Sequence, residues 1–130
     1  MPNATIDQSD VRRACEVQAR SHLLHLRQGV VEAGGNGDAL AVLIVDSARP
    51  LAALLVALAR LEDHGGHGQL EGAAAARHAE RILAVTGGVL TDVVALTHVH
   101  EISAAEAARI FPGYLAAMER LVEYVDRWQQ

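Results

Sequence analysis

Apolar positions recur every three or four residues over most of the chain, which is the period of an α-helix. The first such segment runs from about Asp7 to Ala33, where Leu23, Leu26 and Val30 mark the face that we expect to be buried. The glycine-rich run 34–37 follows and supplies the stop that a helix needs. The pattern therefore predicts a long first helix that ends in a short turn.

The second segment begins near Ala39, with Asp38 as its expected N-cap, and is apolar almost all round as far as Leu61. Such a helix is typically buried on several sides. Its length fits a membrane span, but charged residues such as Asp46 interrupt it, so burial in a bundle is the favoured interpretation. Pro50 predicts a kink or a restart here, with Ser47 as the new N-cap.

Three further helices are predicted, over about 70–85, 90–100 and 103–128. Gly87 and Gly88 are expected to stop the first of them. Together the segments predict an all-α fold, an up-down helical bundle of four to six helices with long first and last helices. With 130 residues, the chain fits a single domain, 1–130.

The last of these helices has the clearest start signal. Ser103 and Glu106 have the spacing of a capping box, in which the serine accepts from the amide of the glutamate and the glutamate reaches back to the amide of the serine. Pro112 predicts a kink near Ile110.

Composition narrows the possible partners. The net charge is −5, and all eleven basic residues are arginines, so a general nucleic-acid-binding surface is not expected. The absence of lysine excludes Schiff-base chemistry and the P-loop cation. A single cysteine, Cys15, and no visible secretion signal favour the cytoplasm.

The histidines are the weak candidates for a metal site. His22 and His25 lie three residues apart on one helical face, but they supply two ligands, whereas zinc sites need three or four. Partly buried histidines of a bundle are the favoured interpretation, so neither a metal nor another cofactor is predicted. His64 and His67 lie in a glycine-rich loop, where exposure to solvent is expected.

Two segments resemble a known family. Residues 20–61 contain a Leu-x-x-Leu-Arg-Gln core, a glycine turn and an apolar helix with a serine at mid-length, and residues 111–128 read FPGYLAAMERLVEYVDRW. Both are similar to the helical C-terminal region of bacterial nucleotidyltransferase-like proteins. The positions that carry the resemblance are Leu26, Arg27, Gln28, Ser47, Tyr114, Leu115, Glu119, Arg120, Leu121, Val125 and Asp126.

The resemblance implies a substrate-binding or assembly domain, because the Gly-Ser loop and the Asp-x-Asp pair of the catalytic domain are missing from the chain. Those carboxylates hold the metal ions of nucleotidyl transfer. No catalytic residue is therefore predicted, and the expected partner is a nucleotidyltransferase catalytic domain or subunit. The candidate binding residues are Arg27, Gln28, Ser47, Arg49 and Tyr114.

Two other functions stay open. A stand-alone homodimeric interaction protein would use the apolar faces around Leu40 to Leu61 as its interface, and a homodimer is also the simplest way to cover long helices. Less favoured is a small metal-binding bundle, or a ribonuclease similar to the HEPN family. Such a ribonuclease pairs an arginine with a histidine four to six residues later. Arg60 and His64 have only three residues between them, and Arg20 and His25 have four but lie on the first helix, outside the family's usual position.

Overall fold

The computed structural model describes residues 8–62 and 71–127, and within these ranges it contains five α-helices, a single 3-10 turn and no strand. The all-α bundle predicted from the sequence is confirmed. The elements are α1 (Gln8–Ala33), α2 (Gly37–Glu62), α3 (Gly72–Ile82), α4 (Val89–Val94), η1 (Ala95–His98) and α5 (Ala104–Asp126).

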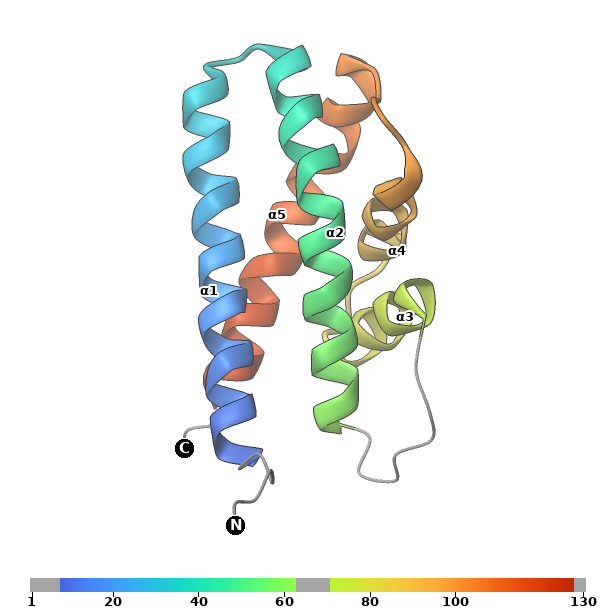
Figure 1. The fold of residues 1–130 in the computed structure, drawn as a ribbon. Helices are drawn as coiled ribbons and strands as arrows, with labels where there is room; N and C mark the ends of the chain where they lie inside the picture. The colour runs from blue at the N-terminus through green and yellow to red at the C-terminus, as the bar shows by residue number, and fades with distance from the viewer. Residues whose placement is uncertain (1–7, 63–70, 128–130) are drawn as a thin grey trace.

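The helices form three layers (Figure 1). α2 and α5 lie in the middle and contact each other, α1 packs against both on one side, and the short helices α3 and α4 pack on the other side. The core is aliphatic, with one large aromatic side chain, Tyr114, completely buried in it. Cys15 is also buried.

α2 is the one helix among the described residues that is long and apolar enough to cross a membrane, over Gly37–Leu61. In the fold it contacts α1, α3, α4, η1 and α5. Several of its large apolar side chains, such as Leu51, Leu55 and Leu58, are completely buried by these neighbours. Part of the apolar surface around Leu40 to Leu61 is thus used inside the bundle, and a homodimer through this segment stays a prediction.

The turn between α1 and α2 corrects one predicted cap. Gly34 has a φ of 56°, a left-handed conformation that glycine adopts without strain and that commonly ends a helix. Asn36, not Asp38, is the N-cap of α2, because its Oδ1 accepts from the backbone amides of Asp38 and Ala39. The prediction of Asp38 was wrong because the helix begins two residues earlier than expected.

Pro50 lies inside α2, which continues without a restart. The prediction that Ser47 caps a new helix was therefore wrong. Its Oγ donates instead to the carbonyl oxygen of Ile44 in the preceding turn, at 2.8 Å. This bond uses the single hydrogen of the Ser47 hydroxyl within the helix.

α3 is shorter than the predicted 70–85 segment and ends before Gly87 and Gly88. The amide of Val85 donates to the carbonyl of Glu80, and Ala84 has a φ of 54°. This is a Schellman motif in which alanine stands where glycine is usual. Arg120 of α5 holds the motif in place, since its Nη1 donates to the carbonyls of Leu83 and Ala84.

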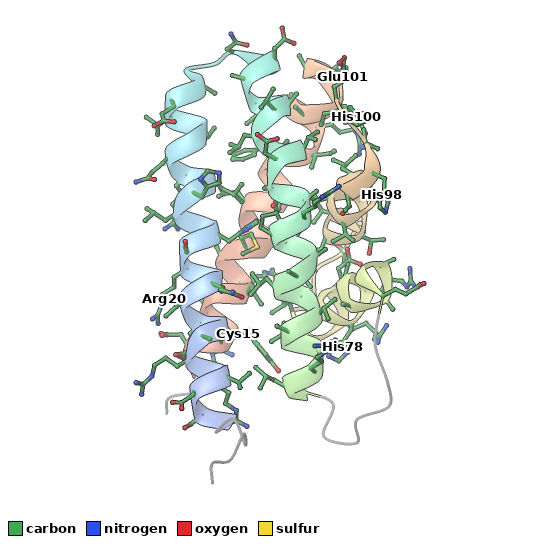
Figure 2. The ribbon with its side chains drawn as sticks, viewed as in Figure 1. Cys15, Arg20, His78, His98, His100 and Glu101 are labelled. Atoms are coloured by element: carbon green, nitrogen blue, oxygen red, sulfur yellow. The ribbon has the colours of Figure 1, made fainter. Side chains whose placement is uncertain are left out.

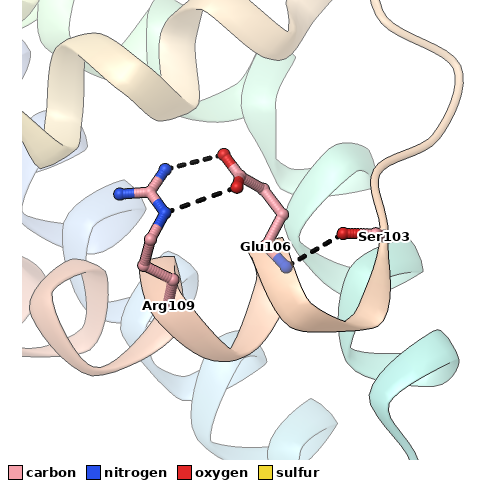
Figure 3. A network of polar contacts seen from close by, with 3 residues as sticks. All are labelled: Ser103, Glu106 and Arg109. Atoms are coloured by element: carbon pink, nitrogen blue, oxygen red, sulfur yellow. Dashed lines mark hydrogen bonds and ion pairs between the residues drawn. The ribbon is translucent and has the colours of Figure 1, made fainter.

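The predicted 90–100 helix is divided into α4 and the 3-10 turn η1. α5 begins at the predicted N-cap, with Ser103 Oγ accepting from the amide of Glu106 at 3.0 Å, but the predicted return bond from the Ser103 amide to the Glu106 carboxylate is replaced by a contact with Arg109. The carboxylate of Glu106 binds the guanidinium of Arg109, one turn further along the helix (Figure 3). The pKa of Glu106 is lowered chiefly by this hydrogen bond. Pro112 lies within a continuous α5.

Candidate functional site

A line of buried polar groups crosses the bundle from α1 to α2 through the hydroxyl of Tyr114. His22 Nε2 lies 2.7 Å from Tyr114 Oη, which in turn lies 2.7 Å from Ser47 Oγ. All three side chains are buried, and Tyr114 is fully so. The consecutive helices α1 and α2 are therefore joined to the distant helix α5 at one point inside an aliphatic core.

The direction of these hydrogen bonds follows from their last acceptor. The carbonyl of Ile44 can only accept, so Ser47 uses its single hydroxyl hydrogen there. Ser47 must then accept from Tyr114, and Tyr114 must accept from His22. His22 therefore carries its hydrogen on Nε2, which leaves Nδ1 as a lone-pair acceptor.

The electrostatics agree with this assignment. Burial, followed by the nearby His25, lowers the pKa of His22 to about 4. Burial raises the pKa of Tyr114 well above its usual range, and the hydrogen bond with Ser47 offsets this only in part. Near neutral pH the whole line is uncharged, as its position in the core requires.

A groove runs between α1 and α2 beside this line. Its first part, the Ser47 hollow, has a volume of about 450 Å³. His22 and Ser47 line its inner wall, and Asp46, Pro50 and His25 also line it. The Ser47 hollow is thus an apolar depression with a few polar groups, which is the usual composition of a small-molecule site.

The second part, the Gly29 hollow, has a volume of about 490 Å³ and shares His25 and Asp46 with the first. Gln28 and Glu32 also line it. The two hollows together are called the α1–α2 groove below. Its side chains include two carboxylates and no arginine, so the groove favours a ligand that donates hydrogen bonds or carries positive charge.

Pro50 adds a backbone acceptor at the same place. An α-helical carbonyl normally accepts from the amide four residues later, and the carbonyl of Asp46 meets proline there. Because proline has no amide hydrogen, this carbonyl lacks its usual donor. Asp46 therefore lines the groove, and its backbone carbonyl lacks the helical donor that it would otherwise have.

The structure separates the five binding residues predicted from the sequence. It brings Ser47 and Tyr114 together in the buried line. Arg27 is on the outside of α1, where it forms an ion pair of 3.1 Å with Glu119 of α5. Gln28 lines the Gly29 hollow, and Arg49 is exposed on α2 and lines neither hollow.

The histidines of the described residues are spread over the fold. His22 binds Tyr114, whereas His25 is exposed at the groove. Figure 2 shows His78, His98 and His100 on α3 and on the segment after α4, away from α1. Within residues 8–62 and 71–127, no three potential ligands gather for a metal ion. His64 and His67 lie outside the described residues, as does Trp128 at the end of the second resembling segment.

A smaller hollow, about 340 Å³, lies between the end of α3, α4 and α5, and Arg109 and Arg120 line it. Both guanidinium groups are already engaged: Arg109 binds Glu106, and Arg120 binds the carbonyls at the end of α3. The arginines thus have structural partners, which leaves this hollow a weaker candidate for binding.

The sequence predicted His22 as a partly buried histidine of a bundle, with a metal ligand as the weaker alternative, but it did not predict the hydrogen bond to Tyr114. The available signal was its position: on a 3.6-residue period His22 lies beside the buried positions Cys15, Ala19 and Leu26. A histidine at such a position needs a buried partner. The partner, Tyr114, is 92 positions away along the chain, so periodicity alone could not identify it.

Comparison of the chain with protein-family models, with curated proteins and with solved structures finds no match.

Proposed function

We propose that this chain is the helical domain of a nucleotidyltransferase, without catalytic residues of its own, and that it binds the acceptor substrate in the α1–α2 groove. The nucleotide-transferring domain is then supplied by another part of the same protein or by another subunit.

The observation that carries the proposal is the hydrogen bond between Ser47 and Tyr114, at 2.7 Å. These residues belong to the two separate segments that resemble nucleotidyltransferase-associated helices. Arg27 and Glu119, also one from each segment, form an ion pair. Residues of the two resembling segments are therefore in contact in the fold. A shared fold requires such contacts, whereas two unrelated chance matches do not.

The chemistry of the groove supports an acceptor substrate. The groove is lined by the carboxylates of Asp46 and Glu32 and by the neutral His22, which are all groups that can accept hydrogen bonds. Hydroxyl and ammonium groups satisfy such acceptors, and hydroxyls and amines are also the groups to which a nucleotide can be transferred. A polar molecule rich in these groups is the class of substrate that we infer.

The transfer itself has to take place elsewhere. Two carboxylates held close together are needed to bind the metal ions that neutralise the nucleotide phosphates. The sequence contains no Gly-Ser loop and no Asp-x-Asp pair. The groove can thus position an acceptor, but a partner must supply the metal ions and the nucleotide.

The test is co-expression with a polymerase-β-type catalytic domain encoded in the same or an adjacent reading frame. We expect the two to co-purify and expect transfer to hydroxyl- or amine-bearing acceptors to need both. Asp46→Asn should raise the KM for the acceptor, and the matched control Asp92→Asn, an exposed aspartate of the smaller hollow, should leave it unchanged. Failure to form a complex, together with transfer that is unaffected by this chain, would contradict the proposal.

A further inference from the structure

The outward face of α1 carries large apolar side chains that no described helix covers. Val17, Leu24 and Val31 are 58%, 54% and 77% exposed, and they follow one another at intervals of seven residues. α2 and α5 cover other sides of α1, which lies at the edge of the bundle (Figure 1). The three side chains therefore form an apolar row on the surface.

The positions between them continue the row. Ala14, Ser21 and Gln28 alternate with the apolar three at spacings of three and four residues, and all are exposed. These six residues are called the α1 seam below. The seam contains no charge, whereas the outer face of a surface helix is normally charged. Alternating three- and four-residue spacing is the geometry by which one helix packs along another, so a helix is the fitting occupant.

The rows on either side of the seam differ in charge. Towards α5 lie Arg13, Arg20 and Arg27, and the last two form ion pairs with Asp126 and Glu119 of α5. Towards α2 lie Gln18, His25 and Glu32, which line the α1–α2 groove. One flank is thus basic, and the other ends in a carboxylate.

This difference in charge between the two flanks favours a second copy of the chain as the occupant, and it favours a parallel over an antiparallel pair of helices. In a parallel pair of helices, a residue on the flank towards α5 of one helix faces the residue five positions later on the flank towards α2 of the other helix. Arg27 would then face Glu32 of a second copy, twice in each dimer. In an antiparallel pair the like flanks face each other, so the arginine rows would meet and repel.

We propose that a second copy of this chain docks in parallel along the α1 seam. The seam extends over 18 residues from Ala14 to Val31, or about 27 Å of helix. Ser21 and Gln28 set the register at the cost of some stability, as polar residues at such positions do. Val17 and Ser21 also line the Ser47 hollow, so the second copy lies along the rim of the α1–α2 groove. This dimer does not depend on the nucleotidyltransferase assignment.

The first test is sedimentation equilibrium of the full chain over a range of concentrations. We expect a reversible monomer–dimer equilibrium that Leu24→Glu abolishes. Val99→Glu is the matched control, because Val99 is exposed but lies outside the seam, and this variant should dimerise like the parent. Circular dichroism checks that both variants keep the parent's helix content. A parent that remains monomeric at every concentration, or a Leu24→Glu variant that dimerises like the parent, would overturn the proposal.

The second test distinguishes the two directions. Arg27→Glu and Glu32→Arg each place like charges opposite one another in a parallel dimer, and mixing the two variants makes both pairs attractive. The mixed dimer should form about tenfold more tightly than either variant alone. Val99→Glu, which adds a charge outside the seam, should show no preference for a mixed dimer with either variant. No preference for the mixed dimer, or tighter self-association of Arg27→Glu than of the parent, would overturn the parallel arrangement.

Discussion

At the scale of single residues, the central feature is a tyrosine hydroxyl buried between a serine and a histidine. An unpaired polar group in such a core costs free energy, and here each hydroxyl is satisfied. On the buried face of α2, the polar residue Ser47 lies between the apolar residues Ile44 and Leu51. The polar line therefore joins α1, α2 and α5 at a defined register.

Tyr114→Phe should destabilise the protein by about 1–3 kcal/mol, because it leaves His22 and Ser47 buried without their partner. Ser47→Ala should also destabilise it. The double variant should be less unstable than the sum of the two, by about 0.5–3 kcal/mol, since the two residues share a hydrogen bond. Urea denaturation measures all three; additive effects would contradict a direct bond.

The low pKa of His22 predicts how stability depends on pH. In the folded protein His22 remains neutral down to about pH 4, whereas an unfolded histidine takes up its proton near pH 6.5. Below pH 6.5 the unfolded chain thus binds more protons, so the contribution of neutral His22 is complete above pH 6.5 and is lost between pH 6.5 and 4.

The measurement compares the parent with His22→Gln, whose amide can still donate to Tyr114. The difference in unfolding free energy between them should change by up to about 3 kcal/mol between pH 7 and pH 4. Because both proteins share every other titrating group, those groups cancel in the difference. A difference that is constant with pH would show that His22 titrates normally.

At the scale of helices, the sequence predicted the existence of the elements better than their ends. Ser103 was identified because its cap is a local signal, read from residues three apart. The end of α3 could not be predicted, since Ala84 has no intrinsic preference for its left-handed conformation and is held by Arg120, 36 positions away. Pro50 and Pro112 lie within continuous helices for the same kind of reason: packing against neighbouring helices outweighs the local preference of proline.

Ala84→Gly should stabilise the protein by about 0.5–1 kcal/mol, because glycine removes the left-handed strain at a small cost in chain entropy. The control is Ala116→Gly at an exposed position within α5, which should destabilise by about 1 kcal/mol. Thermal unfolding of the two variants should therefore shift in opposite directions. A decrease in melting temperature for both would contradict the account of the α3 end.

At the scale of the whole molecule, the bundle depends on close contacts that no helical pattern indicates. A Cβ on Gly37, at the start of α2, would lie 2.6 Å from the Cβ of Ala104, at the start of α5. The pattern of apolar positions predicted the number of helices and much of their buried faces, including Leu23 and Leu26. It could not predict which helices pair, because pairing depends on contacts such as this one and on His22 with Tyr114.

Gly37→Ala should destabilise the protein by about 1–3 kcal/mol, since the added methyl group has no space beside Ala104. Ala104→Gly should restore part of the loss when the two substitutions are combined, because it returns the missing space. Denaturant unfolding measures the free energy of unfolding of the two single variants and the double variant. A double variant that is no more stable than Gly37→Ala alone would contradict the close approach of α2 and α5.

The proposed function requires that the groove bind an acceptor substrate while another domain supplies the nucleotide. The most direct measurement is the rate of nucleotide transfer by the catalytic domain as purified parent chain, Asp46→Asn or Asp92→Asn is added in increasing amounts. We predict that the parent and Asp92→Asn raise the rate to the same plateau, and that Asp46→Asn reaches it only at higher acceptor concentration. Transfer that is equally fast without any added chain, or an unchanged acceptor KM with Asp46→Asn, would contradict the account.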